Sequence, residues 1–162
     1  DTTSGEVRFS GSYVRMSVNT VSGVVRIDSR GTAQETKVDS TSGAMSFAGN
    51  IGKLNTNSIS GEVFTDGAVY AETADIDTTS GAVGMQFANC PADLKIDTIS
   101  GGITLTLPSD SGFTLQYDTV SGSMNCEFSV IMNGRKYISG DGTAQFDLDT
   151  VSGGLRIKAA QE

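Results

Sequence analysis

Histidine and tryptophan are absent from this chain of 162 residues, and proline and cysteine each occur only twice. Without histidine, the Ser-His-Asp and Cys-His mechanisms of nucleophilic catalysis are excluded, and the commonest transition-metal ligand is missing. No run of about 18 apolar residues occurs, which excludes a membrane-spanning helix within this chain. The scarcity of proline argues against a disordered linker, even though the composition is polar.

Positive charge is also scarce, with 11 lysines and arginines against 19 acidic residues. Because the net charge is −8 and no basic stripe occurs, we expect no nucleic-acid partner. Only 37% of the residues are apolar, so a compact globule of this length would be poorly filled. A repeat array needs only a narrow core, and the length suits one domain. We therefore expect a single repeat domain over residues 1–162.

A five-residue pattern recurs eight times: Asp or Asn, then Thr or Ser, then a β-branched residue, then Ser-Gly. Its serines are spaced by 18, 20, 18, 20, 20, 21 and 31 residues. A repeat of about 20 residues indicates a solenoid, in which each unit stacks on its neighbours. We interpret the Ser-Gly pairs as the structural corners of this solenoid: Ser4, Gly5, Ser22, Gly23, Ser42, Gly43, Ser60, Gly61, Ser80, Gly81, Ser100, Gly101, Ser121, Gly122, Ser152 and Gly153.

Apolar and polar residues alternate on both sides of each Ser-Gly pair. The positions three and five residues after the serine are almost all apolar, as in Val25 and Ile27. The positions four and six residues before it are mostly apolar too, as in Ile96 and Leu94. This period of two is typical of short strands with one buried face. The sequence therefore predicts an all-β fold, a single-stranded parallel β-solenoid (β-helix) of about 7–8 coils of about 20 residues, in which successive coils pair in parallel.

Each residue of the motif has a physical role at such a corner. Glycine can take a positive φ, serine can bond a neighbouring backbone amide, and the β-branched residue stiffens the strand end. These roles account for the repeated serines without catalysis. We therefore expect no catalytic residue, no cofactor-binding residue and no enzyme activity.

The last spacing is about ten residues longer than the others. The added segment contains Asn133-Gly134 between two β-rich runs, which is the strongest short signal of a hairpin. We expect a C-terminal hairpin insert near 129–138, followed by a final coil at 139–158. The hairpin would protrude from the stack or fold over its C-terminal end, where it would cover an open strand edge.

The Asp or Asn of each motif forms a column, in which solvated neighbouring carboxylates repel one another by roughly 1 kcal/mol. Asparagine alternates with aspartate in the first five copies, whereas Asp97, Asp118 and Asp149 belong to an uninterrupted run of aspartates. Such a column is either a solvated ladder or a site for divalent cations, calcium above all. The candidate metal ligands are Asp97, Asp118 and Asp149, together with Asp141 in a separate glycine-rich turn. No other cofactor is expected.

The motif Asp-Thr-Val-Ser-Gly, followed by alternating apolar residues, resembles the bacterial DUF4097 family of predicted adhesins. The C-terminal run from Tyr137 to Ile157 is especially similar to the end of that family, and the resemblance covers nearly the whole chain. It implies a β-solenoid ectodomain at the bacterial cell envelope, extracellular and often behind a membrane anchor. Because this chain shows no anchor, we expect one in a missing N-terminal segment. The family supplies no catalytic residues.

Our leading hypothesis is a non-enzymatic module of the bacterial cell surface or envelope, an adhesin that presents a repetitive face for binding or spacing. Its partner would be an unknown surface protein or glycan. One alternative is a regulatory or scaffold ectodomain of the envelope-stress response that binds a membrane protein. Another is a carbohydrate-active β-helix enzyme, although the short corners leave little material for a catalytic cleft.

Overall fold

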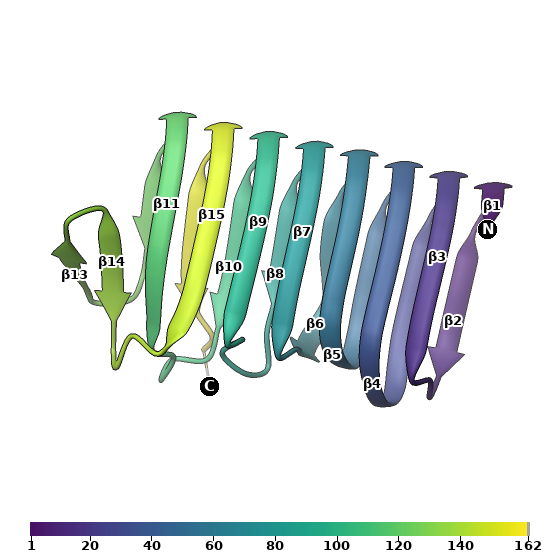
Figure 1. The fold of residues 1–162 in the computed structure, drawn as a ribbon, viewed down its shortest axis with the longest axis horizontal. Coiled ribbons are helices and arrows are strands. Elements are labelled where there is room, and N and C mark those ends of the chain that lie inside the picture. The colour runs from purple at the N-terminus through teal and green to yellow at the C-terminus, as the bar shows by residue number, and fades with distance from the viewer. Residues whose placement is uncertain (162) are drawn as a thin grey trace.

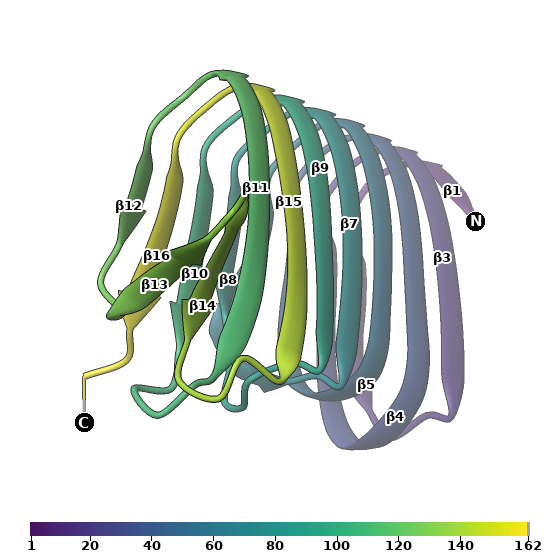
Figure 2. The ribbon, with the colours of Figure 1, turned by 60° about the vertical axis from the view of Figure 1, so that its left-hand side comes forward.

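The alternating segments of the sequence form strands on two faces of one curled, solenoid-like β-sheet (Figure 1). The computed structural model describes residues 1–161, and these residues contain strands and turns but no helix. Each Ser-Gly pair lies at a corner, where the chain leaves a strand of one face and enters a strand of the other (Figure 2). Nothing in residues 1–161 forms the kind of long apolar helix that spans a bilayer.

The long face contains the strands that end at the motif serines. In stacking order these are β1 (Thr2–Ser4), β3 (Arg15–Ser22), the second half of β4 (Val25–Ser42), the second half of β5 (Met45–Ser60), β7 (Thr73–Ser80), β9 (Asp93–Ser100), β15 (Ala144–Ser152) and β11 (Phe113–Ser121). Every pairing among them is parallel, and each keeps the motif serines of neighbouring strands in register.

The short face contains the strands that follow each corner. In the same order these are β2 (Val7–Gly11), the first halves of β4 and β5, β6 (Val63–Tyr70), β8 (Val83–Gln86), β10 (Ile103–Leu107), β16 (Leu155–Ala159) and β12 (Met124–Cys126). β4 and β5 are long enough to bend from the short face into the long face without a break in the strand.

The last repeat does not lie at the end of the stack. β15 pairs with β9 on one side and with β11 on the other, and β16 likewise lies between β10 and β12. The expectation that coils stack in chain order is therefore wrong for this repeat. The connection Pro108–Gly112 carries the chain past one position, which the last repeat then fills (Figure 1).

The hairpin expected near 129–138 consists of β13 (Val130–Asn133) and β14 (Lys136–Ser139). β14 pairs antiparallel with β11, so the sheet is mixed and the prediction of a purely parallel solenoid is wrong at this end. The hairpin crosses the open end of the curl (Figure 2), where Phe128 contacts Phe113 edge to face at 5.4 Å between ring centroids. It covers the part of β11 that would otherwise be an exposed edge.

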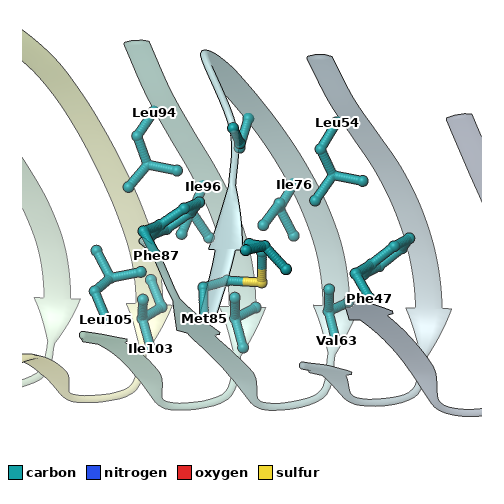
Figure 3. Close-up of a cluster of buried hydrophobic side chains, with 14 of the residues drawn as sticks. Phe47, Leu54, Val63, Ile76, Met85, Phe87, Leu94, Ile96, Ile103 and Leu105 are labelled. Carbon is teal, nitrogen blue, oxygen red and sulfur yellow. The ribbon is translucent and has the colours of Figure 1, made fainter. Parts of the chain in front are cut away.

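The core lies between the two faces and runs along the stack. Figure 3 shows one part of it. The buried positions are those that the period-two alternation predicts, and both faces contribute: Phe47, Leu54, Val63, Ile76, Met85, Phe87, Leu94, Ile96, Ile103 and Leu105. Each such side chain contributes roughly 1.5–3 kcal/mol by leaving water. At the first corner, Val7 and Phe9 are only half-buried, because a neighbouring strand covers them on one side alone.

Candidate functional site: a groove along the stacked corners

The corners are held together by a ladder of backbone hydrogen bonds that passes through each Ser-Gly pair. The amide of Gly43, for example, donates to the carbonyl of Ser60 at 3.1 Å, and the amide of Gly23 donates to the carbonyl of Ser42 at 3.2 Å. The β-branched residue before each serine takes no part in the regular register, so its carbonyl lacks a ladder partner.

At five of the corners, the motif serine supplies the missing donor. Ser42 Oγ donates to the carbonyl of Val21 at 3.3 Å, and Ser80 Oγ donates to the carbonyl of Ile59 at 3.3 Å. The sequence-based expectation that serine bonds a backbone amide is therefore wrong, because the corner amides already have carbonyl partners in the ladder. The hydroxyl satisfies the carbonyl that the ladder skips.

The corner glycines allow this close stacking. Gly43 has a φ of 128°, and a Cβ placed on it would lie 1.8 Å from the carbonyl oxygen of Gly23. A side chain is therefore excluded both by the backbone conformation and by the neighbouring corner. These repeated constraints hold the residues on either side of the corner in straight columns.

A groove runs along the stacked corners, with a volume of about 1050 Å³. Three columns of motif residues line it, one residue from each of the eight copies per column. We call it the corner groove, and its three columns the acidic column, the hydroxyl column and the ridge. The corner groove is lined by the motif alone, so any ligand there meets the same three residue types at every step.

The acidic column consists, in stacking order, of Asp1, Asn19, Asp39, Asn57, Asp77, Asp97, Asp149 and Asp118. In its first half, each asparagine relieves the repulsion between carboxylates. Asn19 Nδ2 donates to Asp1 Oδ1 at 2.7 Å, and Asn57 Nδ2 donates to Asp39 Oδ1 at 2.7 Å. The second half has no asparagine, and Lys95 Nζ pairs there with Asp97 Oδ2 at 2.5 Å.

The second half of the acidic column is electrostatically strained. Burial raises the pKa of the Asp149 carboxyl, and repulsion from Asp147, Asp97 and Asp118 raises it further. Burial and the neighbouring Asp75 carboxylate likewise raise the pKa of Asp77, while Lys95 opposes the shift. The negative charges in this half outnumber the cation that faces them, so a positively charged ligand would be favoured here.

The ridge consists of Thr3, Val21, Thr41, Ile59, Thr79, Ile99, Val151 and Val120. Its apolar members point outward: Ile59 is 57% exposed, Ile99 54% and Val120 82%. Their exposure follows from the corner, which turns the β-branched residue away from both faces of the core. The sequence interpretation treated these residues only as stiffeners of the strand end and missed that they form one wall of a groove.

The hydroxyl column lies between the other two columns and is formed by Thr2, Thr20, Ser40, Ser58, Thr78, Thr98, Thr150 and Thr119. Most of its side chains are buried. Within residues 1–161, the hydroxyls of Ser58, Thr78, Thr98 and Thr150 have no hydrogen-bond partner. One oxygen of Asp149, in the adjacent acidic column, is also buried without a partner.

The structure brings three of the four predicted metal candidates together, since Asp97, Asp149 and Asp118 occupy consecutive places in the acidic column. Asp141 lies elsewhere, in the turn before β15, where its Oδ1 accepts hydrogen bonds from the amide and the hydroxyl of Thr143. Among residues 1–161, no three acidic or cysteine side chains converge closely enough to hold an ion. Calcium binding along the column therefore stays a prediction. Cys90 and Cys126 are free and partly buried.

The fold and the corner groove together define a class of protein: a repeat-built β-sheet module whose repeated motif forms a continuous surface groove. The profile of the Toastrack DUF4097 family matches residues 1–158, so the chain belongs to this family. A search of curated proteins finds no match. A solved crystal structure of a candidate cell adhesion protein from Clostridium sporogenes aligns with a TM-score of 0.47 and 14% identity, over 98% of this chain and 93% of that one. Similarity at that level does not carry a function from one protein to the other.

Proposed function

We propose that this domain is a non-enzymatic binding module of the bacterial cell surface, an adhesin that binds its partner in the corner groove. The observation that supports this most strongly is that the groove is lined by equivalent residues of all eight motif copies. A catalytic site needs unlike groups at one place, whereas a row of like groups suits a long, repeating ligand. The lack of histidine and the repetition of the serines also favour binding over catalysis.

A surface location fits the polar, acidic surface and the solenoid-like form, which presents a long side to a partner. We propose that the domain is extracellular and attached to the envelope by a segment outside the sequence described. We also propose that the sheet forms a solenoid of about 7–8 coils.

Blocking the groove tests the proposal. Thr79 lies on the ridge and is exposed, so Thr79→Arg should fill the middle of the groove without disturbing the core. The exposed Thr32, outside the groove, provides the matched control Thr32→Arg. We expect the native domain and the control to bind to a glycan array or to intact bacterial envelopes, and Thr79→Arg to lose that binding. Equal binding by both variants would refute the groove as the binding face.

The native domain and these two variants also distinguish the adhesin from the two alternative functions, a regulatory ectodomain and a carbohydrate-active enzyme. Binding of one purified membrane protein, with no glycan hits, would favour the regulatory ectodomain. Turnover of polysaccharides by the native domain would favour the enzyme.

A further inference from the structure

The second half of the acidic column forms a concentrated patch of negative charge. Asp77, Asp97, Asp149 and Asp118 lie on the neighbouring strands β7, β9, β15 and β11, in register with one another. Their spacing is that of paired strands, about 4.8 Å. Within the described residues, Lys95 is the cation that pairs with this run. A ligand that placed one cation beside each strand would relieve the repulsion along it.

Further carboxylates on the long face, beside the acidic column, add to its negative charge. Asp75 and Asp147 lie two residues before Asp77 and Asp149 on the same strands, and their charges contribute to the raised pKa values of those two carboxyls. The first half of the groove differs, because Asn19 and Asn57 interrupt the carboxylates there. Negative charge is therefore more concentrated in the second half of the groove, and a cationic ligand should bind there rather than in the first half.

The opposite wall of the same half is apolar. Ile99, Val151 and Val120 are adjacent on the ridge and are 54%, 47% and 82% exposed. A ligand that fits both walls must present cations to the acidic column and apolar surface to the ridge. Between the walls, the hydroxyls of Thr78, Thr98 and Thr150 are buried, so a ligand meets the two walls rather than these oxygens.

The period of the groove distinguishes between the polymers that meet this description. An extended peptide advances about 3.3 Å per residue, so its same-side residues recur at nearly 7 Å and lose register with the corners within a few steps. The rings of a β-1,4-linked sugar polymer advance by a length close to the strand spacing, and successive rings are rotated by about half a turn. Groups on one edge of the polymer therefore recur at about two strand spacings and keep register with every second strand. Such a ring also has apolar C–H faces, and an amino sugar with a free amine carries a cation. No aromatic side chain lines the groove, so the rings would pack on methyl groups.

We propose that the second half of the corner groove binds a linear amino-sugar polymer with free amines, the ammonium groups of one edge beside every second aspartate of the run Asp77, Asp97, Asp149 and Asp118 and its rings against Ile99, Val151 and Val120. This proposal rests on the proposed function and adds the class of ligand. It also predicts the length of the recognised segment, because four strands carry the uninterrupted aspartates.

The first test measures affinity by calorimetry for β-1,4-linked glucosamine oligomers of two to six rings, at low salt and a pH of about 6, which lies between the ordinary pKa values of a carboxyl and an amine. We expect the affinity to rise with each ring up to four rings and then to level off. It should fall steeply with added salt, because the contacts are charged and partly solvated. Matched N-acetylated oligomers, which lack the cation, should bind at least about tenfold more weakly.

The second test uses substitutions that the fold already contains at these positions. Asparagine occupies the acidic column natively at Asn19 and Asn57, so the double variant Asp77→Asn with Asp149→Asn should fold normally. We expect it to bind the four-ring glucosamine oligomer about tenfold more weakly. The matched control is Asp66→Asn, which removes an exposed carboxylate of β6 outside the groove and should change affinity less than about twofold.

A third variant tests the apolar wall. Ile99→Thr places on the ridge a residue that occurs there natively, for example at Thr79. Because the net charge is unchanged, it should weaken glucosamine binding about threefold or more without altering the dependence on salt.

The outcomes separate the two proposals. If N-acetylated oligomers bind as tightly as the free amines, and Thr79→Arg abolishes that binding, the groove remains the binding face but the cationic ligand is refuted. If poly-lysine binds in the groove more tightly per charge than the sugar polymer, the ligand is a peptide and the inference is wrong. If Asp66→Asn weakens binding as much as the double variant, the effect is one of net charge, and the inference fails. If Thr79→Arg changes no binding at all, both proposals fail.

Discussion

Replacing Gly43 by alanine tests how tightly the corners are packed. A methyl group there would lie 1.8 Å from the carbonyl oxygen of Gly23 and 2.7 Å from its carbonyl carbon. Real Cβ atoms stay at least about 3 Å from such atoms, so the two corners must separate locally by more than 1 Å. That shift would break the hydrogen bond from the amide of Gly23 to the carbonyl of Ser42, now 3.2 Å long, and the bond from Ser42 Oγ to the preceding corner.

The magnitude follows from these losses. A non-glycine residue at positive φ costs about 1–2 kcal/mol. Breaking the two partly buried hydrogen bonds to backbone carbonyls costs about 1 kcal/mol each. The displaced packing adds about 1 kcal/mol. Gly43→Ala should therefore lower the free energy of unfolding by about 4–5 kcal/mol, which corresponds to a fall in Tm of about 10–20 °C for a domain of this size.

Two further glycines separate the clash from the strain of the backbone. Gly5 occupies the same motif position, with a φ of 123°, but no atom lies within 4 Å of its added Cβ, because within residues 1–161 no other corner stacks on that side of it. Gly67, in the middle of the stack, has a φ of 90° and equally open surroundings. Both alanine variants should cost only about 1–2 kcal/mol in urea denaturation. If Gly43→Ala costs no more than Gly67→Ala, the tight stacking of the corners is refuted.

Three other substitutions or reagents test the corner and the groove. Ser42→Ala should cost about 1 kcal/mol in urea denaturation because it leaves a corner carbonyl without its donor. Ser4→Ala, at the first corner, should cost almost nothing; equal costs would contradict the serine ladder. Asp149→Asn should raise Tm at neutral pH. The folded-state pKa of Asp149 is raised, so this carboxyl opposes folding once pH exceeds its unfolded value, and the gain should vanish below that value. A gain that persists in acid would refute the electrostatic explanation. Cys90 and Cys126 should react slowly with a thiol reagent at neutral pH, because burial raises the pKa of both thiols, and both should react at once after denaturation. Fewer than two reactive thiols in the denatured chain would indicate a disulfide.

The local structure could be predicted from the sequence because each signal is repeated. The alternation around Val25, Ile27, Leu94 and Ile96 identifies inward positions, and the structure confirms that all four are buried. The hairpin signal at Asn133-Gly134 rests on local turn chemistry, although the structure places the turn one residue later, at Gly134 and Arg135. Such local preferences do not depend on which strands become neighbours, so one sequence suffices to predict them.

The order of the strands could not be predicted for the same reason. The motif copies are nearly identical, so β9 can pair in the same register with the strand that ends at Ser121 or with the one that ends at Ser152. The choice depends on the connection Pro108–Gly112 and on the hairpin, which pairs with β11 and makes it the last parallel strand of the long face. The corner groove was missed because it requires the bend that turns the ridge outward, which period-two alternation does not reveal.

The position of the last repeat has a consequence for local stability. Because β15 lies between β9 and β11, its motif residues Asp149, Thr150 and Ser152 are paired on both sides. β11 comes earlier in the sequence, yet its residues 117–121 have a strand on one side only, since β14 pairs with Phe113–Gln116 alone. Strands at an edge open locally at lower cost than strands in the interior of a sheet.

Amide hydrogen exchange followed by mass spectrometry can therefore rank the two strands. Peptides that contain residues 148–152 should exchange more slowly than peptides that contain 117–121, because opening β15 disrupts two ladders and opening the end of β11 disrupts one. A stack in chain order would place 117–121 in the interior and 148–152 at the edge, and would reverse the ranking. The same insertion places Asp149 between Asp97 and Asp118, so a reversed ranking would move Asp149 from within the acidic run to its end.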